Sequence, residues 1–206
     1  MTITSIEKTK KGRYSLFIDG DFLFSIHKDI FLTNNIEVNT EITVEQLEEL
    51  RQKDEIYSCK QSALDILSHT AKSSGVLRDK LREHYSEDAV DIAIERMEEL
   101  GLIDDYDYAK RLTKDYINLR GYSKMRIKNE LYKKKIDRYI IDDVLSECIA
   151  DDEIAPIISI IEKKYYNKIS SREDRQKTIM ALQRRGFMYD DIKSAIKIIE
   201  EMDENE

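Results

Sequence analysis

Apolar residues recur along most of this chain with a period of 51 residues. Tyr85, Ile136 and Phe187 stand 51 positions apart, and each is followed by apolar residues at helical spacing. The positions that keep this register are Val90, Ala93, Ile94 and Met97; Ile141, Val144, Leu145 and Cys148; and Ile192, Ala195, Ile196 and Ile199. A fixed period of this length predicts a tandem array of similar helical units, which presents surfaces rather than one deep pocket.

The first 26 residues show a different pattern, with short runs rich in β-branched and aromatic residues. The runs are Ile3–Lys8, Arg13–Ile18 and Phe22–Ile26, separated by Lys10-Lys11-Gly12 and Asp19-Gly20. Asp-Gly favours the tight hairpin turns that need positive φ. We therefore predict a two- or three-stranded meander, which must pack on the following helices because so small a sheet is not stable alone.

Helices are expected in the rest of the chain, because the whole sequence has only one proline and six glycines. Thr43 and Gln46 have capping-box spacing, so they predict the start of a short helix whose apolar face holds Leu47 and Leu50. The expected parts are 1–53 for the strands and this short helix, and three-helix units at 54–103, 104–151 and 152–206.

Residues 101–105 link the first of these units to the second. Gly101 is suited to a left-handed helix cap, Leu102 to packing back on that helix, and Asp104 to capping the next helix. The link is too short for a free tether. The expected fold is therefore mainly α-helical, an elongated and curved rod of three three-helix units preceded by the small meander.

Charge is unevenly distributed along the sequence. The net charge is −8, yet basic residues cluster at 8–13, 124–138 and 184–185. The acidic end, Glu200 to Glu206, is interpreted as a solvated tail, and it could also discourage indiscriminate binding to nucleic acid.

The sequence offers few candidates for catalysis. The three histidines, His27, His69 and His84, lie far apart, and none has metal-ligand spacing with Cys, Asp or Glu. Cys59 and Cys148 form no paired motif, and no apolar run approaches a signal peptide or a membrane span. We therefore expect a cytoplasmic protein with reduced cysteines that is not an enzyme and has no cofactor, no metal site and no membrane contact.

The basic clusters are the strongest functional signal from the residues themselves. Tyr122, Tyr132 and Tyr139 are interleaved with them, a combination that suits phosphate contacts and stacking on bases. The alternative is a solvated face whose cations favour a helix C-terminus and whose tyrosines pack between helices. The candidate contact residues are Lys124, Arg126, Lys128, Lys133, Lys134, Lys135, Arg138, Arg184 and Arg185.

The order of the motifs resembles the RecX family, from the N-terminal strands to the last helix. The residues that carry the resemblance are Ala63-Leu64-x-x-Leu67, Ser73-x-x-x-Leu77-x-x-Lys80-Leu81, Gly101-Leu102-Ile103-Asp104-Asp105-x-x-Tyr108-Ala109, Ile127-x-x-Glu130-Leu131 and Leu182-x-x-Arg185-Gly186-Phe187. Two departures are visible. His69-Thr70-Ala71-Lys72 precedes Ser73 where the family commonly has a basic pair, and Lys135 replaces the glycine usual after the second helix of its unit.

This resemblance implies a function for the whole chain. RecX-like proteins lie in the helical groove of the RecA filament on single-stranded DNA and inhibit RecA ATPase, filament growth and strand exchange. The implied partners are the RecA filament and single-stranded DNA, the latter bound weakly or through RecA. The implied setting is DNA repair, recombination and the SOS response, and a monomer is expected.

Two other functions remain open at this stage. The chain could bind DNA by itself, although a net charge of −8 argues against tight unaided binding. It could also be a helical scaffold for another protein.

Overall fold

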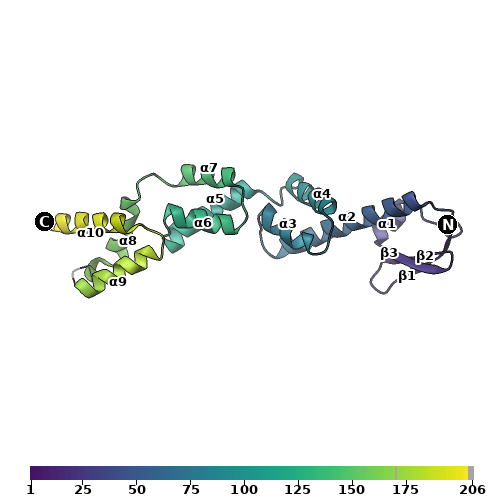
Figure 1. Ribbon diagram of the computed structural model, residues 1–206, viewed down its shortest axis with the longest axis horizontal. Coiled ribbons are helices and arrows are strands. Elements are labelled where there is room, and N and C mark those ends of the chain that lie inside the picture. Colours follow the sequence, from purple (N-terminus) through teal and green to yellow (C-terminus); the bar gives the residue numbers. More distant parts are fainter. Residues whose placement is uncertain (170, 204–206) are drawn as a thin grey trace. The chain divides into compact units, whose positions relative to one another are not determined.

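The computed structural model describes residues 1–169 and 171–203. It divides into two compact units, Met1–Ile103 and Asp104–Glu206, and each is described separately below (Figure 1). Within the described residues, the chain consists of helices after a single small sheet at the N-terminus. The expected mainly α-helical fold with an N-terminal meander is confirmed.

The first unit begins with a three-stranded antiparallel sheet of order β1-β2-β3, made of Ile3–Lys8, Tyr14–Ile18 and Asp21–Ile26. Asp19 and Gly20 form the turn between β2 and β3 with φ of 51° and 95°, the conformation that Asp-Gly predicts. The sheet buries its apolar face against α1 (Lys28–Thr33) and the start of α2 (Val44–His69). It is therefore stabilised by the helices, as expected for a sheet of this size.

Helix α2 is long, and it corrects the prediction of a short helix ending near residue 53. Thr43 and Gln46 form the expected capping box, with Thr43 N donating to Gln46 Oε1 at 2.9 Å. No glycine or proline interrupts residues 44–69, so the helix continues without a break through the expected boundary. Its Leu47 and Leu50 belong to the core under the sheet, whereas Cys59 and Ala63 belong to the next core.

The sheet is tied to this helix by one buried carboxylate. Asp54 of α2 accepts hydrogen bonds from the Arg13 guanidinium and from the backbone N–H of His27. The same Arg13 guanidinium donates to the carbonyl oxygen of Ser25 at 2.6 Å. The carboxylate therefore satisfies donors from both ends of the hairpin at once.

The C-terminal half of α2 packs with α3 (Ser74–Arg82) and α4 (Glu87–Glu99), and we call this set the first bundle. Its core includes Leu77, Leu81, Val90 and Met97. Burial, followed by the charge of Glu55, raises the pKa of the Cys59 thiol in this core to about 11, so the thiol is protonated at neutral pH.

Gly101 closes α4 with φ of 66°, as predicted. The prediction for the next residue is wrong, because Leu102 is exposed while Ile103 is buried in the bundle core. The Asp104 carboxylate accepts from Asp107 N at 2.9 Å, so it caps α5 as expected.

The second unit contains two further bundles. The second bundle comprises α5 (Asp105–Asp115), the π-helix η1 (Tyr116–Arg120), α6 (Lys124–Lys133) and α7 (Arg138–Cys148). The third bundle comprises α8 (Ile154–Lys164), the 3-10 helix η2 (Tyr166–Lys168), α9 (Arg172–Gln183) and α10 (Tyr189–Asp203). The periodic positions fill their cores. Ile141, Val144 and Leu145 are buried in one, and Ile192, Ala195 and Ile196 in the other.

The acidic end is only partly a tail. Glu200 and Asp203 lie on α10, where the Arg175 guanidinium pairs with Glu200 and Tyr166 Oη donates to Asp203 Oδ1 at 2.8 Å. Residues 204–206 of the expected tail lie outside the described residues. The prediction of a solvated tail is therefore wrong for residues 200–203, because these pairs fix the last helical turn.

None of the helices described is both long enough and apolar enough to cross a membrane.

Candidate functional site

The predicted basic residues are centred on α6 of the second bundle. Ser123 caps this helix, its Oγ accepting from Arg126 N at 3.2 Å, and Ile127 and Leu131 fix the buried side. The remaining side carries the cations. The basic face is defined here as Lys124, Arg126, Lys128, Lys133, Lys134, Lys135 and Arg138.

Carboxylates of the same unit neutralise much of this face. Lys124 Nζ lies 2.9 Å from Asp151 Oδ1, and Lys128 and Arg138 both pair with Asp142 of α7. The hydrogen bond from Lys128 lowers the pKa of the Asp142 carboxyl, and the one from Lys124 lowers the pKa of Asp151. Nearby carboxylates therefore neutralise the positive charges of these side chains.

Glu130 has the same role on α6 itself. It lies 3.0 Å from Lys133 Nζ and 3.2 Å from Arg126 Nε, and the hydrogen bond from Lys133 lowers the pKa of Glu130. Lys133 and Arg138 still expose 66% and 75% of their side chains, so both can reach a partner. Lys135 lies in the turn after α6 with a left-handed φ of 55°.

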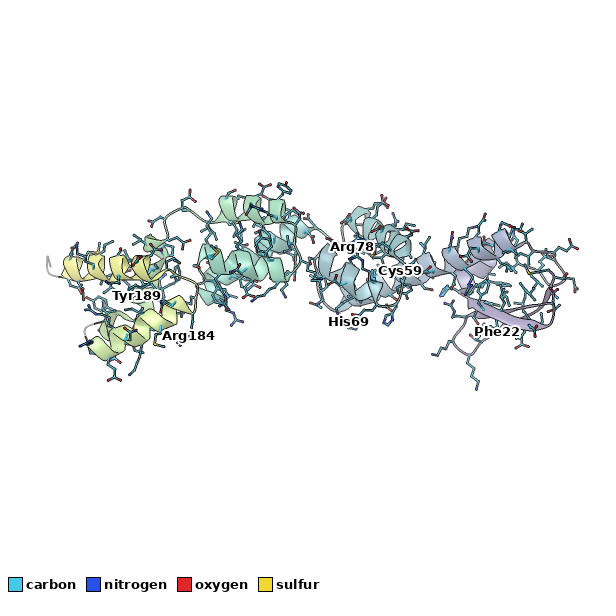
Figure 2. The ribbon with its side chains drawn as sticks, in the orientation of Figure 1. Phe22, Cys59, His69, Arg78, Arg184 and Tyr189 are labelled. Atoms are coloured by element: carbon cyan, nitrogen blue, oxygen red, sulfur yellow. The ribbon has the colours of Figure 1, made fainter. Side chains whose placement is uncertain are left out.

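The two arginines predicted from the third bundle do not lie on α6, but they adjoin it. Ser123 N donates to the carbonyl oxygen of Arg185 at 3.0 Å, and Arg126 Nη1 donates to that of Arg184 at 3.2 Å. The Arg184 side chain is exposed at the end of α9 (Figure 2). The structure therefore brings Arg184 and Arg185 together with the N-terminal end of the basic face, around Arg126.

The tyrosines have unequal surroundings. Tyr122 is covered on its ring by Tyr116, with ring centroids 5.7 Å apart, and by the Arg126 guanidinium at 5.1 Å. Tyr132 and Tyr139 are exposed, Tyr139 by 81%. Stacking on a base is therefore open to Tyr132 and Tyr139, while Tyr122 packs between helices as the alternative interpretation proposed.

A pocket that the sequence analysis missed lies where the second and third bundles meet. It has a volume of about 260 Å³ and is lined in part by Asn118, Tyr122, Lys163, Lys164 and Arg185. The signal available in the sequence was the Lys163-Lys164 pair at the end of an apolar helical run. Its proximity to Arg185, 21 or 22 positions later in the chain, follows only from the fold.

Two glycines bring the bundles into contact beside this pocket. A Cβ at Gly121 would lie 3.2 Å from Ile160 Cδ1. A Cβ at Gly186 would lie only 2.6 Å from Arg126 Cβ and from Ser123 Oγ. The absence of side chains at these positions therefore permits the close approach.

Comparison with protein families matches most of this chain. Four family models match in order: the N-terminal domain of Regulatory protein RecX at residues 1–43, and the first, second and third three-helix domains of RecX at 59–97, 104–145 and 151–196.

Curated relatives agree with these matches. A protein of Clostridium beijerinckii named Regulatory protein RecX is 36% identical over 174 residues, covering 84% of this chain and 80% of the relative. Its namesake in Clostridioides difficile is 30% identical and covers 98% of this chain and 97% of the relative.

Solved structures resemble this fold as well. A crystal structure of regulatory protein RecX has a TM-score of 0.65 at 24% identity, covering 94% of this chain and 98% of that one, which supports the fold. RecX from Lactobacillus salivarius has a TM-score of 0.60 at 28% identity, covering 72% of this chain and 98% of that one. The resemblance seen in the motifs is thus confirmed, and the chain belongs to the RecX family of regulatory proteins.

Proposed function

We propose that this protein is a non-enzymatic regulator of the RecA recombinase. It binds the RecA filament on single-stranded DNA in the helical groove and inhibits ATP hydrolysis, filament growth and strand exchange. The observation that carries the proposal is the ordered match of four RecX domains, with relatives named Regulatory protein RecX aligned over nearly the whole chain. We also propose that the protein is a monomer, that it is cytoplasmic, and that it acts in DNA repair, recombination and the SOS response.

The proposed contact surface is the basic face together with Arg184 and Arg185. Surface ion pairs such as Lys133–Glu130 and Arg138–Asp142 are worth about 0–1 kcal/mol each, so a cation can exchange its local carboxylate for a filament carboxylate or a phosphate at little cost. We keep the division into units at 54–103, 104–151 and 152–206 as part of the proposal. Several weak contacts from linked units add through effective concentration.

The direct test measures DNA-stimulated ATP hydrolysis by the cognate RecA with this protein added. Slower hydrolysis, shorter filaments and less strand exchange are expected. If the rate, the filament length and strand exchange all remain unchanged, the proposed function is wrong.

The contact surface is tested with the double variant Lys133→Glu/Arg138→Glu. Both side chains are mainly exposed, and the folded core does not contain them. Reversing Lys124 and Lys128 is a poorer choice, because only 31% of each of these side chains is exposed. The double variant should lose at least tenfold in filament affinity while its thermal unfolding changes little.

A matched control exists in the third bundle. Lys177 pairs with Glu173 and Lys197 with Glu201, so Lys177→Glu/Lys197→Glu makes the same charge change at exposed intrahelical pairs. Filament affinity should change less in this control. Equal losses of filament affinity in the two variants would show that the basic face is only a solvated surface.

The same experiment separates the proposal from direct DNA binding. Binding to RecA-coated DNA is expected to be much tighter than binding to bare single-stranded DNA. Equal affinity for the two would favour a protein that acts on nucleic acid by itself.

A further inference from the structure

The pocket between the second and third bundles has an unusual lining for an acidic protein. Lys163 and Lys164 come from the last turn of α8, and Arg185 comes from the turn between α9 and α10. Asn118, Ser159 and Tyr122 add neutral hydrogen-bond donors, and none of the lining residues is Asp or Glu. In a chain with a net charge of −8, three cations therefore converge on one small space without a carboxylate among them.

These cations differ from those of the basic face in their partners. Across residues 1–169 and 171–203, no salt bridge involves Lys163, Lys164 or Arg185. On α6, in contrast, Lys124, Lys128 and Lys133 are each paired with a carboxylate. A cation that has no local counter-charge breaks no existing ion pair when an anion arrives, so only its hydration is lost. The helix C-terminus accounts for a preference for lysine at α8, but it does not account for Arg185, which belongs to another element.

The third cation is held in place. Arg185 is half-buried, its Nη2 lies 3.4 Å from Tyr165 Oη, and its guanidinium sits 5.6 Å from the Tyr165 ring centroid. Its backbone carbonyl oxygen accepts from Ser123 N. A guanidinium positioned in this way loses little side-chain freedom when it binds an anion.

The opposite wall comes from the second bundle. The π-helix Tyr116–Arg120 contributes Ile117 and Asn118, and Gly121 packs close to Ile160 of α8. Single π-turns are rare and often occur at functional sites. The pocket therefore requires both bundles, held together at Gly121 and Gly186.

From this arrangement we infer that the pocket binds a backbone phosphate group of single-stranded DNA. This inference rests on the proposed function, which brings the protein to such DNA. Lysine, arginine, amide and hydroxyl donors from several directions suit the oxygens of a phosphate. The volume of about 260 Å³ is below that of typical small-molecule sites, so it suits one phosphate and its immediate linkages. The ring of Tyr122 is already covered by Tyr116 and Arg126, so the pocket offers no platform for a base.

The test uses the full-length protein without RecA, so that its result does not depend on filament regulation. Binding of a fluorescent dT oligonucleotide is measured by anisotropy at several salt concentrations for the wild type and for Lys163→Gln/Lys164→Gln. The control is Lys177→Gln/Lys197→Gln, which removes the same charge at exposed residues outside the pocket. Thermal unfolding verifies that all three proteins are folded.

We expect the pocket variant to bind roughly tenfold more weakly. Each lost phosphate contact should also reduce the slope of log K against log salt by about 0.7 for a single strand. The control should change affinity by less than about twofold, because its lysines make no pocket contact. An equal loss in both variants overturns the inference, because it would show only a general effect of charge.

A second measurement uses the wild type alone and does not depend on any variant. Titration with inorganic phosphate should shift the backbone amide resonances of Gly121, Ser159 and Arg185 in NMR spectra. Unchanged resonances would overturn the inference. In a competition experiment, the inference would also be overturned if oligoglutamate displaced the oligonucleotide at the same concentrations as inorganic phosphate. If the wild type binds in the pocket but leaves RecA ATPase, filament length and strand exchange unchanged, the proposed function fails and the phosphate site stands.

Discussion

The second and third bundles form the same left-handed turn with different residues. Lys135 and Gly186 stand 51 positions apart, each after the middle helix of its bundle, and both have left-handed φ, 55° and 95°. In the second bundle a lysine adopts this conformation. In the third bundle the residue is glycine, and a Cβ there would overlap Arg126 and Ser123 of the second bundle.

The difference shows what the repeat does and does not specify. The apolar period specifies the cores, which are alike in the two bundles. The left-handed turn by itself tolerates a lysine, at the modest cost of that conformation. Gly186 is required for a second reason, because it allows the neighbouring bundle to approach. A departure from the repeat can therefore mark a junction between bundles, and not only a local turn.

The largest predicted effect comes from filling this junction. Gly186→Ala should lower the free energy of unfolding of the second unit by about 3 kcal/mol, because it adds backbone strain and a Cβ only 2.6 Å from two atoms. Urea unfolding followed by circular dichroism measures the loss.

Gly20 supplies the matched control. It has the same φ of 95°, but a Cβ there would meet nothing within 4 Å, so Gly20→Ala tests the strain alone. Its cost should be clearly smaller, about 1 kcal/mol. Equal losses at the two positions would show that the junction does not depend on Gly186.

A second difference between the bundles lies in their cores. Thr178 of α9 occupies the position that Ile127 occupies in α6, and it is buried with no hydrogen-bond partner for its Oγ1 among the described residues. Thr178→Val keeps the shape and removes the unpaired hydroxyl. Stability should rise by about 1 kcal/mol in thermal or urea unfolding. A loss of stability would indicate that the hydroxyl has a partner, such as a bound water.

Glycine, which the third bundle has at the equivalent position, should stabilise the turn after α6 in the second bundle. Lys135→Gly removes a side chain from a left-handed position, although it also raises the entropy of the unfolded chain. A net gain of about 0.5 kcal/mol in the free energy of unfolding is expected. No gain would mean that contacts of the Lys135 side chain compensate for its backbone conformation.

The smallest predicted effect concerns two carboxyl groups whose pKa values are shifted in opposite directions. The Lys128 hydrogen bond lowers the pKa of Asp142 in the second bundle, whereas burial, aided by the charge of Asp191, raises the pKa of Glu153 at the start of the third. Asp142 therefore contributes stability above its unfolded-state pKa, and this is lost as pH falls through its folded-state pKa. The contribution from Glu153 is present below its unfolded-state pKa and is lost as pH rises through its folded-state pKa.

The corresponding variants should respond with opposite signs. At pH 7, Asp142→Asn should lower stability and Glu153→Gln should raise it, and both differences should shrink near pH 3. NMR titration of the two carboxyl groups in the wild type checks the pKa directions directly. Shifts of the same sign would contradict this contrast between the bundles.

Much of the architecture could be predicted because its determinants are local. The Asp19-Gly20 turn, the Thr43 capping box and the periodic cores depend on residues close in sequence. The short helix predicted to end near residue 53 was wrong for the opposite reason. The repeat suggested a new helix there, but nothing in the local sequence stops the helix that begins at Val44.

The candidate site was less predictable because charge compensation is partly a tertiary property. The pairing of Arg138 with Asp142 follows helical spacing and was available from the sequence. The pairing of Lys124 with Asp151, 27 positions away, was not. The same is true of the pocket, whose lysines and arginine converge only once two bundles have docked.

The unbroken helix α2 has a mechanical consequence for the first unit. Its first half is buried in the core of the sheet and its second half in the core of the first bundle. Rotation of the sheet against the bundle would therefore require breaking backbone hydrogen bonds within a helix of 26 residues. The sheet and the first bundle therefore share one continuous helix, with no loop between them that could serve as a hinge.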